Sequence, residues 1–149
     1  MKKLTTLLLS ACILITLLTG CSSKVVEIEE HNWKYSTIQN RENGQVIYCS
    51  TENKKLYEDA EVLDIWCSAD DGILLISNNN TQETWSFTYS LNSKSSNSCL
   101  YDVRYSADNE VSGMATVGIT DKANENDEYT LIITIDDYVL NFAEELKNS

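Results

Sequence analysis

The chain has no proline, only five glycines, a single histidine, and about half as many basic as acidic side chains. The lack of proline and the low glycine content exclude collagen-like and proline-rich linker sequences. Eleven lysines and arginines against twenty-three aspartates and glutamates leave a formal net charge of −12. Such a surface repels nucleic acid and anionic lipid head groups, so we expect neither to be bound through charge.

The chain does have enough apolar and aromatic residues for a folded domain. Apolar residues make up 42% of it, and three tryptophans, eight tyrosines and two phenylalanines are too many for a disordered protein. A length of 149 residues suits one domain with its own hydrophobic core. We expect residues 31–149 to form that single domain.

The first twenty-one residues have the layout of an export signal. Lys2 and Lys3 precede an uncharged, mostly apolar run over 4–18. As a helix this run rises only about 22 Å, which is short of the roughly 30 Å hydrocarbon core of a bilayer. That length fits a cleaved leader better than a permanent span. We therefore predict a helical signal peptide over 1–20, followed at once by Cys21.

The end of this leader, Leu18-Thr19-Gly20-Cys21, resembles the lipobox of bacterial lipoproteins, in which an aliphatic residue, a small residue and Gly or Ala precede a cysteine. The resemblance implies that the Cys21 thiol receives a diacylglycerol and that a peptidase cuts between Gly20 and Cys21. It also implies a lipid anchor in the cell membrane, on the extracytoplasmic face, and we expect no other cofactor. Residues 21–30 are then the lipidated cysteine and a polar tether.

From residue 31 onward, apolar and polar residues alternate with a period of two, which is typical of strands in an antiparallel sheet. Polar turn residues divide the segment at short intervals. We predict about eight or nine strands, near 32–38, 45–51, 61–68, 73–77, 83–91, 99–106, 110–120, 129–135 and 138–144. The expected fold class is all-β, an antiparallel meander closed as a small barrel or folded as a sandwich.

The last two predicted strands allow their register to be checked from sequence. If Asp136-Asp137 is a two-residue hairpin loop, three pairs of apolar residues face each other on one side of the hairpin. These pairs are Ile135 with Tyr138, Ile133 with Leu140, and Leu131 with Phe142. A slip of one residue would destroy this match, so the pattern predicts both the turn and the register.

Three cysteines lie in the domain, and an odd number leaves at least one thiol outside any disulfide. Cys67 and Cys99 are in phase with apolar strand residues, which favours buried thiols in the core. Two alternatives stay open. One is a single bridge such as Cys49–Cys67, and the other is a reactive or metal-binding thiol, although no CxxC spacing indicates metal. The single histidine, His31, is interpreted as a surface or linker residue.

The sequence contains no P-loop, no Rossmann glycine motif, no G-x-S-x-G nucleophile elbow and no HExxH motif. The paired carboxylates Asp70-Asp71 and Asp136-Asp137 fall at predicted turns, where Asp is a common turn former. Adjacent residues on a strand also point to opposite faces, so neither pair forms a catalytic dyad by spacing alone. We therefore assign no catalytic and no metal-ligating residue, and we do not expect an enzyme.

Aromatic residues are the remaining clue to function. Trp33, Trp66 and Trp85 are candidate ligand-binding residues that could line a concave pocket, and they could equally belong to a packed core. Trp33, early in the first strand of a meander, resembles the tryptophan of lipocalin-like proteins, although His31-Asn32-Trp33 lacks the glycine of their G-x-W motif. We predict a non-catalytic binding or interaction module at the cell surface, whose partner is a small apolar ligand or an envelope protein. The alternatives are a lipocalin-like carrier of a small apolar ligand and an envelope enzyme.

Overall fold

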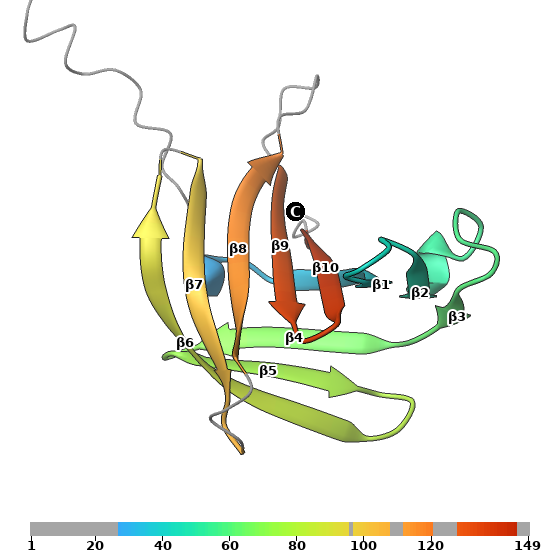
Figure 1. Cartoon of the computed structure of the whole chain (residues 1–149), viewed down its shortest axis with the longest axis horizontal. Coiled ribbons are helices and arrows are strands. Elements are labelled where there is room, and N and C mark those ends of the chain that lie inside the picture. The colour runs from blue at the N-terminus through green and yellow to red at the C-terminus, as the bar shows by residue number, and fades with distance from the viewer. Residues whose placement is uncertain (1–26, 96, 108–111, 121–127, 146–149) are drawn as a thin grey trace, which may run out of the picture.

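The computed structural model describes residues 27–95, 97–107, 112–120 and 128–145, which form an all-β structure (Figure 1). Eight strands close into an antiparallel barrel, because β10 returns to pair with β1. The strands of the barrel are β1 (Trp33–Asn40), β4 (Ile65–Asp70), β5 (Ile73–Asn78), β6 (Glu83–Lys94), β7 (Ser98–Tyr105), β8 (Ser112–Thr120), β9 (Glu128–Ile135) and β10 (Tyr138–Glu144). The predicted all-β meander is confirmed, and of its two forms the structure is the barrel.

Two short strands extend the sheet beside β1. The strand β2 (Val46–Cys49) pairs antiparallel with the second half of β1, and β3 (Glu61–Val62) pairs in parallel with β2. A 3₁₀ helix, η2 (Thr51–Asn53), lies in the connection between β2 and β3. The first half of β1 pairs with β4 instead, so β2 and β4 share one edge of β1. For this reason the single strand predicted over 61–68 is divided into β3 and β4.

The hairpin of β9 and β10 has the predicted register. Its paired residues are Ile135 with Tyr138, Ile133 with Leu140, and Leu131 with Phe142, together with the alternate pairs between them. Asp136 and Asp137 form the turn, and Asp136 has a φ of 48°, a left-handed conformation that Asp tolerates better than most residues. Leu131, Ile133 and Phe142 are buried in the barrel, as the period-two pattern required.

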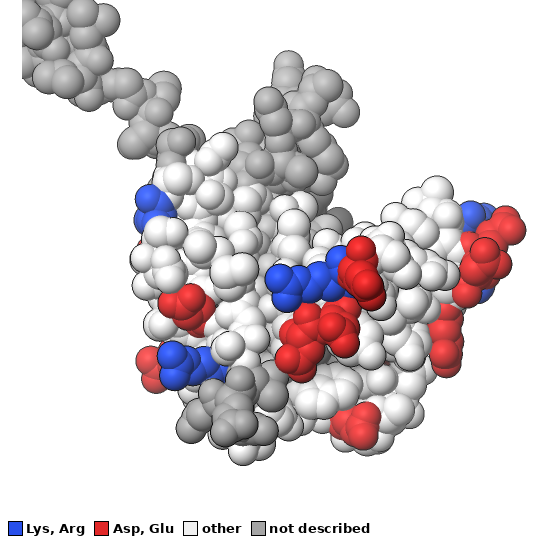
Figure 2. Space-filling model, in the orientation of Figure 1, with Lys and Arg blue, Asp and Glu red and all other residues white. Residues whose placement is uncertain are grey.

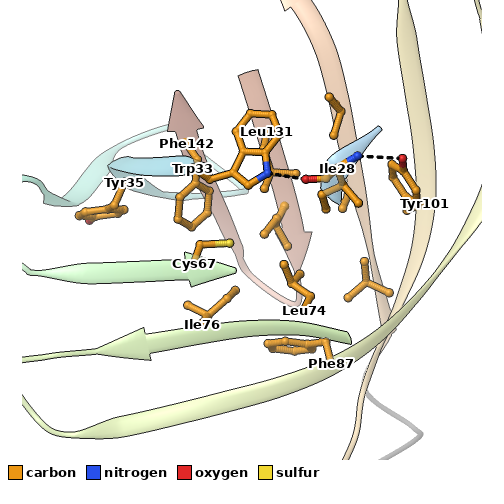
Figure 3. Packing of buried hydrophobic residues seen from close by; sticks show 14 of the residues in the cluster. Ile28, Trp33, Tyr35, Cys67, Leu74, Ile76, Phe87, Tyr101, Leu131 and Phe142 are labelled. Carbon is orange, nitrogen blue, oxygen red and sulfur yellow. Dashed lines mark hydrogen bonds between the residues drawn. The ribbon is translucent and has the colours of Figure 1, made fainter. Parts of the chain in front are cut away.

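A short 3₁₀ helix, η1 (Ile28–Glu30), precedes β1 and closes one end of the barrel (Figure 3). The Ile28 side chain is buried in the core, and its backbone N–H donates a 3.1 Å hydrogen bond to the Tyr101 hydroxyl. The carboxylate of Glu29 accepts hydrogen bonds from the Tyr89 hydroxyl and from the backbone N–H of Gly72. Part of the segment predicted as a tether, 21–30, therefore packs into the barrel. The sequence could not predict this packing, because the few apolar residues of this acidic segment show no strand or helix periodicity.

His31 is not the surface or linker residue that the sequence indicated. Its side chain is only 10% exposed, and its Nδ1 lies 2.7 Å from a carboxylate oxygen of Glu144 on β10. The imidazole ring also packs against Trp33 and Tyr129, with centroids 5.4 Å and 4.5 Å apart. The local sequence could not predict this position, because Glu144 is 113 residues away along the chain and becomes a neighbour only when β10 pairs with β1.

The three cysteines of the domain are all buried, and no disulfide joins cysteines of the described ranges. Cys67 and Cys99 belong to the barrel core, as their phase within the strands predicted. Cys49 lies on β2 and is buried as well. Burial raises the pKa of the Cys67 thiol to about 12, so this sulfur stays protonated near neutral pH. The sequence left three interpretations of these cysteines open, and the structure shows buried thiols.

Candidate ligand-binding pocket

The barrel holds an apolar pocket of about 510 Å³, a size typical of small-molecule sites. Most of its wall is made of aliphatic and aromatic side chains. The described residues that line it are Ile38, Tyr48, Leu63, Ile65, Ile76, Asn78, Trp85, Phe87, Tyr105, Ile135, Asp136, Tyr138 and Leu140. They come from β1, β2, β4, β5, β6, β7, β9 and β10 and from two connections between strands.

This pocket lies at the end of the barrel opposite η1. Individual strands that start beside η1 reach the pocket at their other end. The strand β5 starts next to Gly72, which is hydrogen-bonded to Glu29 of η1, and reaches the pocket at Ile76 and Asn78. Likewise β1 starts at Trp33 beside η1 and reaches the pocket at Ile38. One end of the barrel is therefore filled, and the other end has room for a ligand.

The side chains that line the pocket range from buried to half exposed. Ile76 and Phe87 are deep, with exposed fractions of 2% and 7%, whereas Leu140 and Trp85 are partly buried and pack against the core from one side. Tyr138 is 47% exposed, directly after the β9–β10 turn. This gradient from buried to exposed side chains indicates a depression that has an apolar floor and opens to solvent.

Besides Tyr48, Tyr105 and Tyr138, the polar residues of this wall are Asn78 and Asp136, and Tyr35 lies near it on β1. The Asn78 side chain is buried, and its Oδ1 accepts a 2.9 Å hydrogen bond from the backbone N–H of Asn80, which fixes the turn after β5. Among the described residues that line the pocket, Asp136 is the only charged one. The Tyr35 hydroxyl is buried and has no hydrogen-bond partner within the described part of the chain. Burial, followed by the nearby Cys49, raises the pKa of Tyr35 and keeps it protonated.

The structure separates the three tryptophans that the sequence offered as ligand-binding residues. Only Trp85 lines the pocket. Trp33 is buried at the closed end, where its indole Nε1 donates a 2.8 Å hydrogen bond to the Ile28 carbonyl. Trp66 points away from the barrel interior and is 50% exposed, opposite Lys34 on the neighbouring strand. Alternation sets Trp66 apart from the inward-facing Trp33 and Trp85, but it does not say which end of the barrel each of those two occupies.

The two carboxylate pairs lie at opposite ends of the barrel. Asp71 is in the β4–β5 turn at the closed end, with a φ of 47°, and Asp136 is in the β9–β10 turn at the pocket. Asp136-Asp137 form a turn, as predicted, whereas of the other pair only Asp71 is in the turn and Asp70 ends β4. The two pairs do not converge. Within the described ranges, no group of three or more His, Cys, Asp or Glu side chains is placed to hold a metal ion.

The predicted signal peptide, including Gly20, and the predicted lipidation residue Cys21 lie outside the described residues. Within the described ranges, no helix is long and apolar enough to cross a bilayer.

Comparison with known proteins finds no family model, no curated protein and no solved structure that matches this chain. The residues that sequence reasoning missed are mainly the aliphatic ones of the pocket, since the same period-two pattern describes a filled and a hollow interior.

Proposed function

We propose that this protein is a lipid-anchored binding protein on the extracytoplasmic face of a membrane, and that its barrel takes up a small apolar molecule. The observation that carries the binding role is the 510 Å³ apolar pocket at the end of the barrel opposite η1. Apolar ligands bind such sites because the surface they remove from water contributes about 25 cal/mol per Å². The lipobox-like ending at Cys21 supports the anchor.

The position of η1 relates the anchor to the pocket. Only residues 22–26 separate Cys21 from Glu27, a reach of about 20 Å when fully extended. The carboxylate of Glu27 pairs at 3.1 Å with the Lys94 ammonium, and the next residue, Ile28, is already buried at the closed end. We therefore expect the closed end to face the membrane and the pocket to face away from it, where it meets molecules from the aqueous side.

The anchor is tested by replacing the acceptor of the lipid. Metabolic labelling with a radioactive or clickable palmitate should label the natural protein and shift it to the membrane fraction. Cys21→Ser should abolish both the label and the processing of the leader, whereas Cys49→Ser should keep both, because that buried thiol is not in a lipobox. Labelling that persists in Cys21→Ser would contradict the anchor and leave the pocket proposal untouched.

The binding role is tested with the protein from residue 22 onward, which contains the whole barrel between Glu27 and Glu145 and its closing pair of strands. N-phenyl-1-naphthylamine, an uncharged dye that fluoresces in apolar sites, should bind it. Leu140→Trp enlarges a pocket side chain and should weaken binding by about tenfold, the effect of roughly 1.4 kcal/mol. Ile132→Trp changes a 39% exposed residue one strand away and should bind like the parent. Circular dichroism confirms that both variants are folded, and equal binding by a folded Leu140→Trp would exclude this pocket as the site.

A further inference from the structure

The polar groups around the pocket indicate which apolar molecules it admits. We infer that the pocket accepts uncharged apolar molecules and rejects organic anions of the same size. This inference rests on the proposed function, because it describes the ligand of that same pocket. Its basis is the charge and hydrogen-bonding capacity of the described residues in and beside the pocket wall.

The first observation is the charge at the mouth. Asp136 lines the pocket, and Asp137 follows it in the same exposed turn. Figure 2 shows a group of acidic side chains beside the turn that joins β9 to β10. An anion that enters an apolar pocket must lose water and also approach these carboxylates, and both effects oppose its binding.

A basic residue, Arg41, also contacts this turn. The Arg41 guanidinium lies 3.4 Å from the backbone carbonyl oxygen of Asp136, so it meets the peptide rather than the carboxylate. Arg41 also lines a separate groove on the outer surface of the barrel, together with Arg104 and Asp102. Neither arginine is among the residues that line the apolar pocket. The wall thus offers an anion no cation among its described residues.

Behind the mouth, the described wall of the pocket carries no charge. It consists mainly of aliphatic and aromatic side chains such as Ile76, Phe87 and Leu140, together with the Asn78 amide. None of these groups supplies a positive charge that would offset a buried carboxylate or sulfonate. The interior therefore suits an uncharged molecule.

A matched pair of dyes tests this selection. N-phenyl-1-naphthylamine and 1-anilinonaphthalene-8-sulfonate share one aromatic framework, and only the second carries a negative charge. We expect the protein from residue 22 onward to bind the uncharged dye at least about tenfold more tightly, given the cost of burying a charge. Equal affinity for the two dyes would overturn the inference while leaving the proposed function intact. Failure of both dyes to bind would overturn the proposed function and the inference with it.

The contribution of the mouth is measured by removing one charge without changing the turn. Asp136→Asn keeps a residue that tolerates the left-handed φ of 48°, and it should strengthen binding of the sulfonate dye about threefold to tenfold. The gain should shrink in high salt, and it should exceed any change in binding of the uncharged dye. Asp71→Asn is the matched control, because it neutralises a turn residue with a φ of 47° at the closed end. An unchanged sulfonate affinity in Asp136→Asn, or an equal gain in Asp71→Asn, would contradict the role of the mouth.

Discussion

The indole Nε1 of Trp33 donates a 2.8 Å hydrogen bond to the carbonyl oxygen of Ile28, and both residues are almost fully buried. This bond attaches η1 to the start of β1 and so closes one end of the barrel. Trp33→Phe keeps an aromatic ring but leaves the Ile28 carbonyl without this donor. We expect a loss of about 1–3 kcal/mol in the free energy of unfolding, measured by urea denaturation.

The matched control for this variant is Trp66→Phe, on the outer face of β4. Trp66 is half exposed, and replacements at such positions change stability by only about 0.5 kcal/mol. If the two variants lose the same amount of stability, the closing hydrogen bond is not a significant part of the fold.

Two buried tyrosines should respond in opposite directions to the loss of their hydroxyl groups. The Tyr101 hydroxyl accepts a hydrogen bond from the Ile28 N–H, so Tyr101→Phe should destabilise the barrel by about 1–3 kcal/mol. The Tyr35 hydroxyl is buried without a partner among the described residues, so Tyr35→Phe should leave stability equal or higher by about 1 kcal/mol. Thermal unfolding of the two variants and the parent protein measures these changes in stability. A large loss of stability in Tyr35→Phe would mean that the Tyr35 hydroxyl has a partner.

Two glycines of β8 differ in what a side chain would meet. A Cβ at Gly113 would collide with the backbone oxygen of Thr134 and come within 2.9 Å of the Ile135 side chain, whereas the nearest atom to a Cβ at Gly118 is 4.0 Å away. Because backbone of a paired strand cannot move cheaply, Gly113→Ala should cost about 1–3 kcal/mol or prevent folding. Gly118→Ala should be close to neutral. Guanidinium unfolding of both variants tests the close spacing of β8 and β9 at Gly113. Equal stabilities of the two variants would contradict that spacing.

Most of the architecture could be predicted from the sequence, because inward-facing side chains recur at every second residue along a barrel strand. The β9–β10 register followed from apolar pairing across Asp136-Asp137, and the structure has the same pairs. Closure could not be predicted in this way, since the pairing of β10 with β1 joins residues such as Trp33 and Glu144 that share no local pattern. The buried position of His31 escaped prediction for the same reason.

The candidate site was less accessible to sequence reasoning than the fold. Alternation marks Trp85 and Trp33 as inward-facing but does not say which end of the barrel each occupies, and that end decides between a pocket wall and a filled core. Asn78 lies just beyond the strand predicted over 73–77, yet it ends β5 and is buried in the pocket wall. A pocket is a space between several strands, so it depends on how side chains from distant residues meet.

Stability should fall in alkaline solution because of the buried Cys67 thiol. Burial raises its pKa to about 12 from an ordinary value of 9.0, so the folded state favours the protonated form. The stabilisation is complete below pH 9, where the unfolded thiol is also protonated, and is lost as the pH rises toward 12. At pH 11, two units above the ordinary pKa, the loss should be about 3 kcal/mol relative to pH 8. Cys67→Val should have a shallower decline in denaturation experiments across this range, and identical slopes would contradict the burial of this thiol.

Methyl NMR during titration with N-phenyl-1-naphthylamine tests most directly whether the barrel binds a ligand at the end opposite η1. The methyl resonances of Ile76 and Leu140, which line the pocket, should shift with saturation. Those of Val117 and Leu131, buried in the core and absent from the pocket wall, should stay nearly unchanged. Shifts confined to Val117 and Leu131, or no shift at any of the four residues, would contradict a binding site in this pocket.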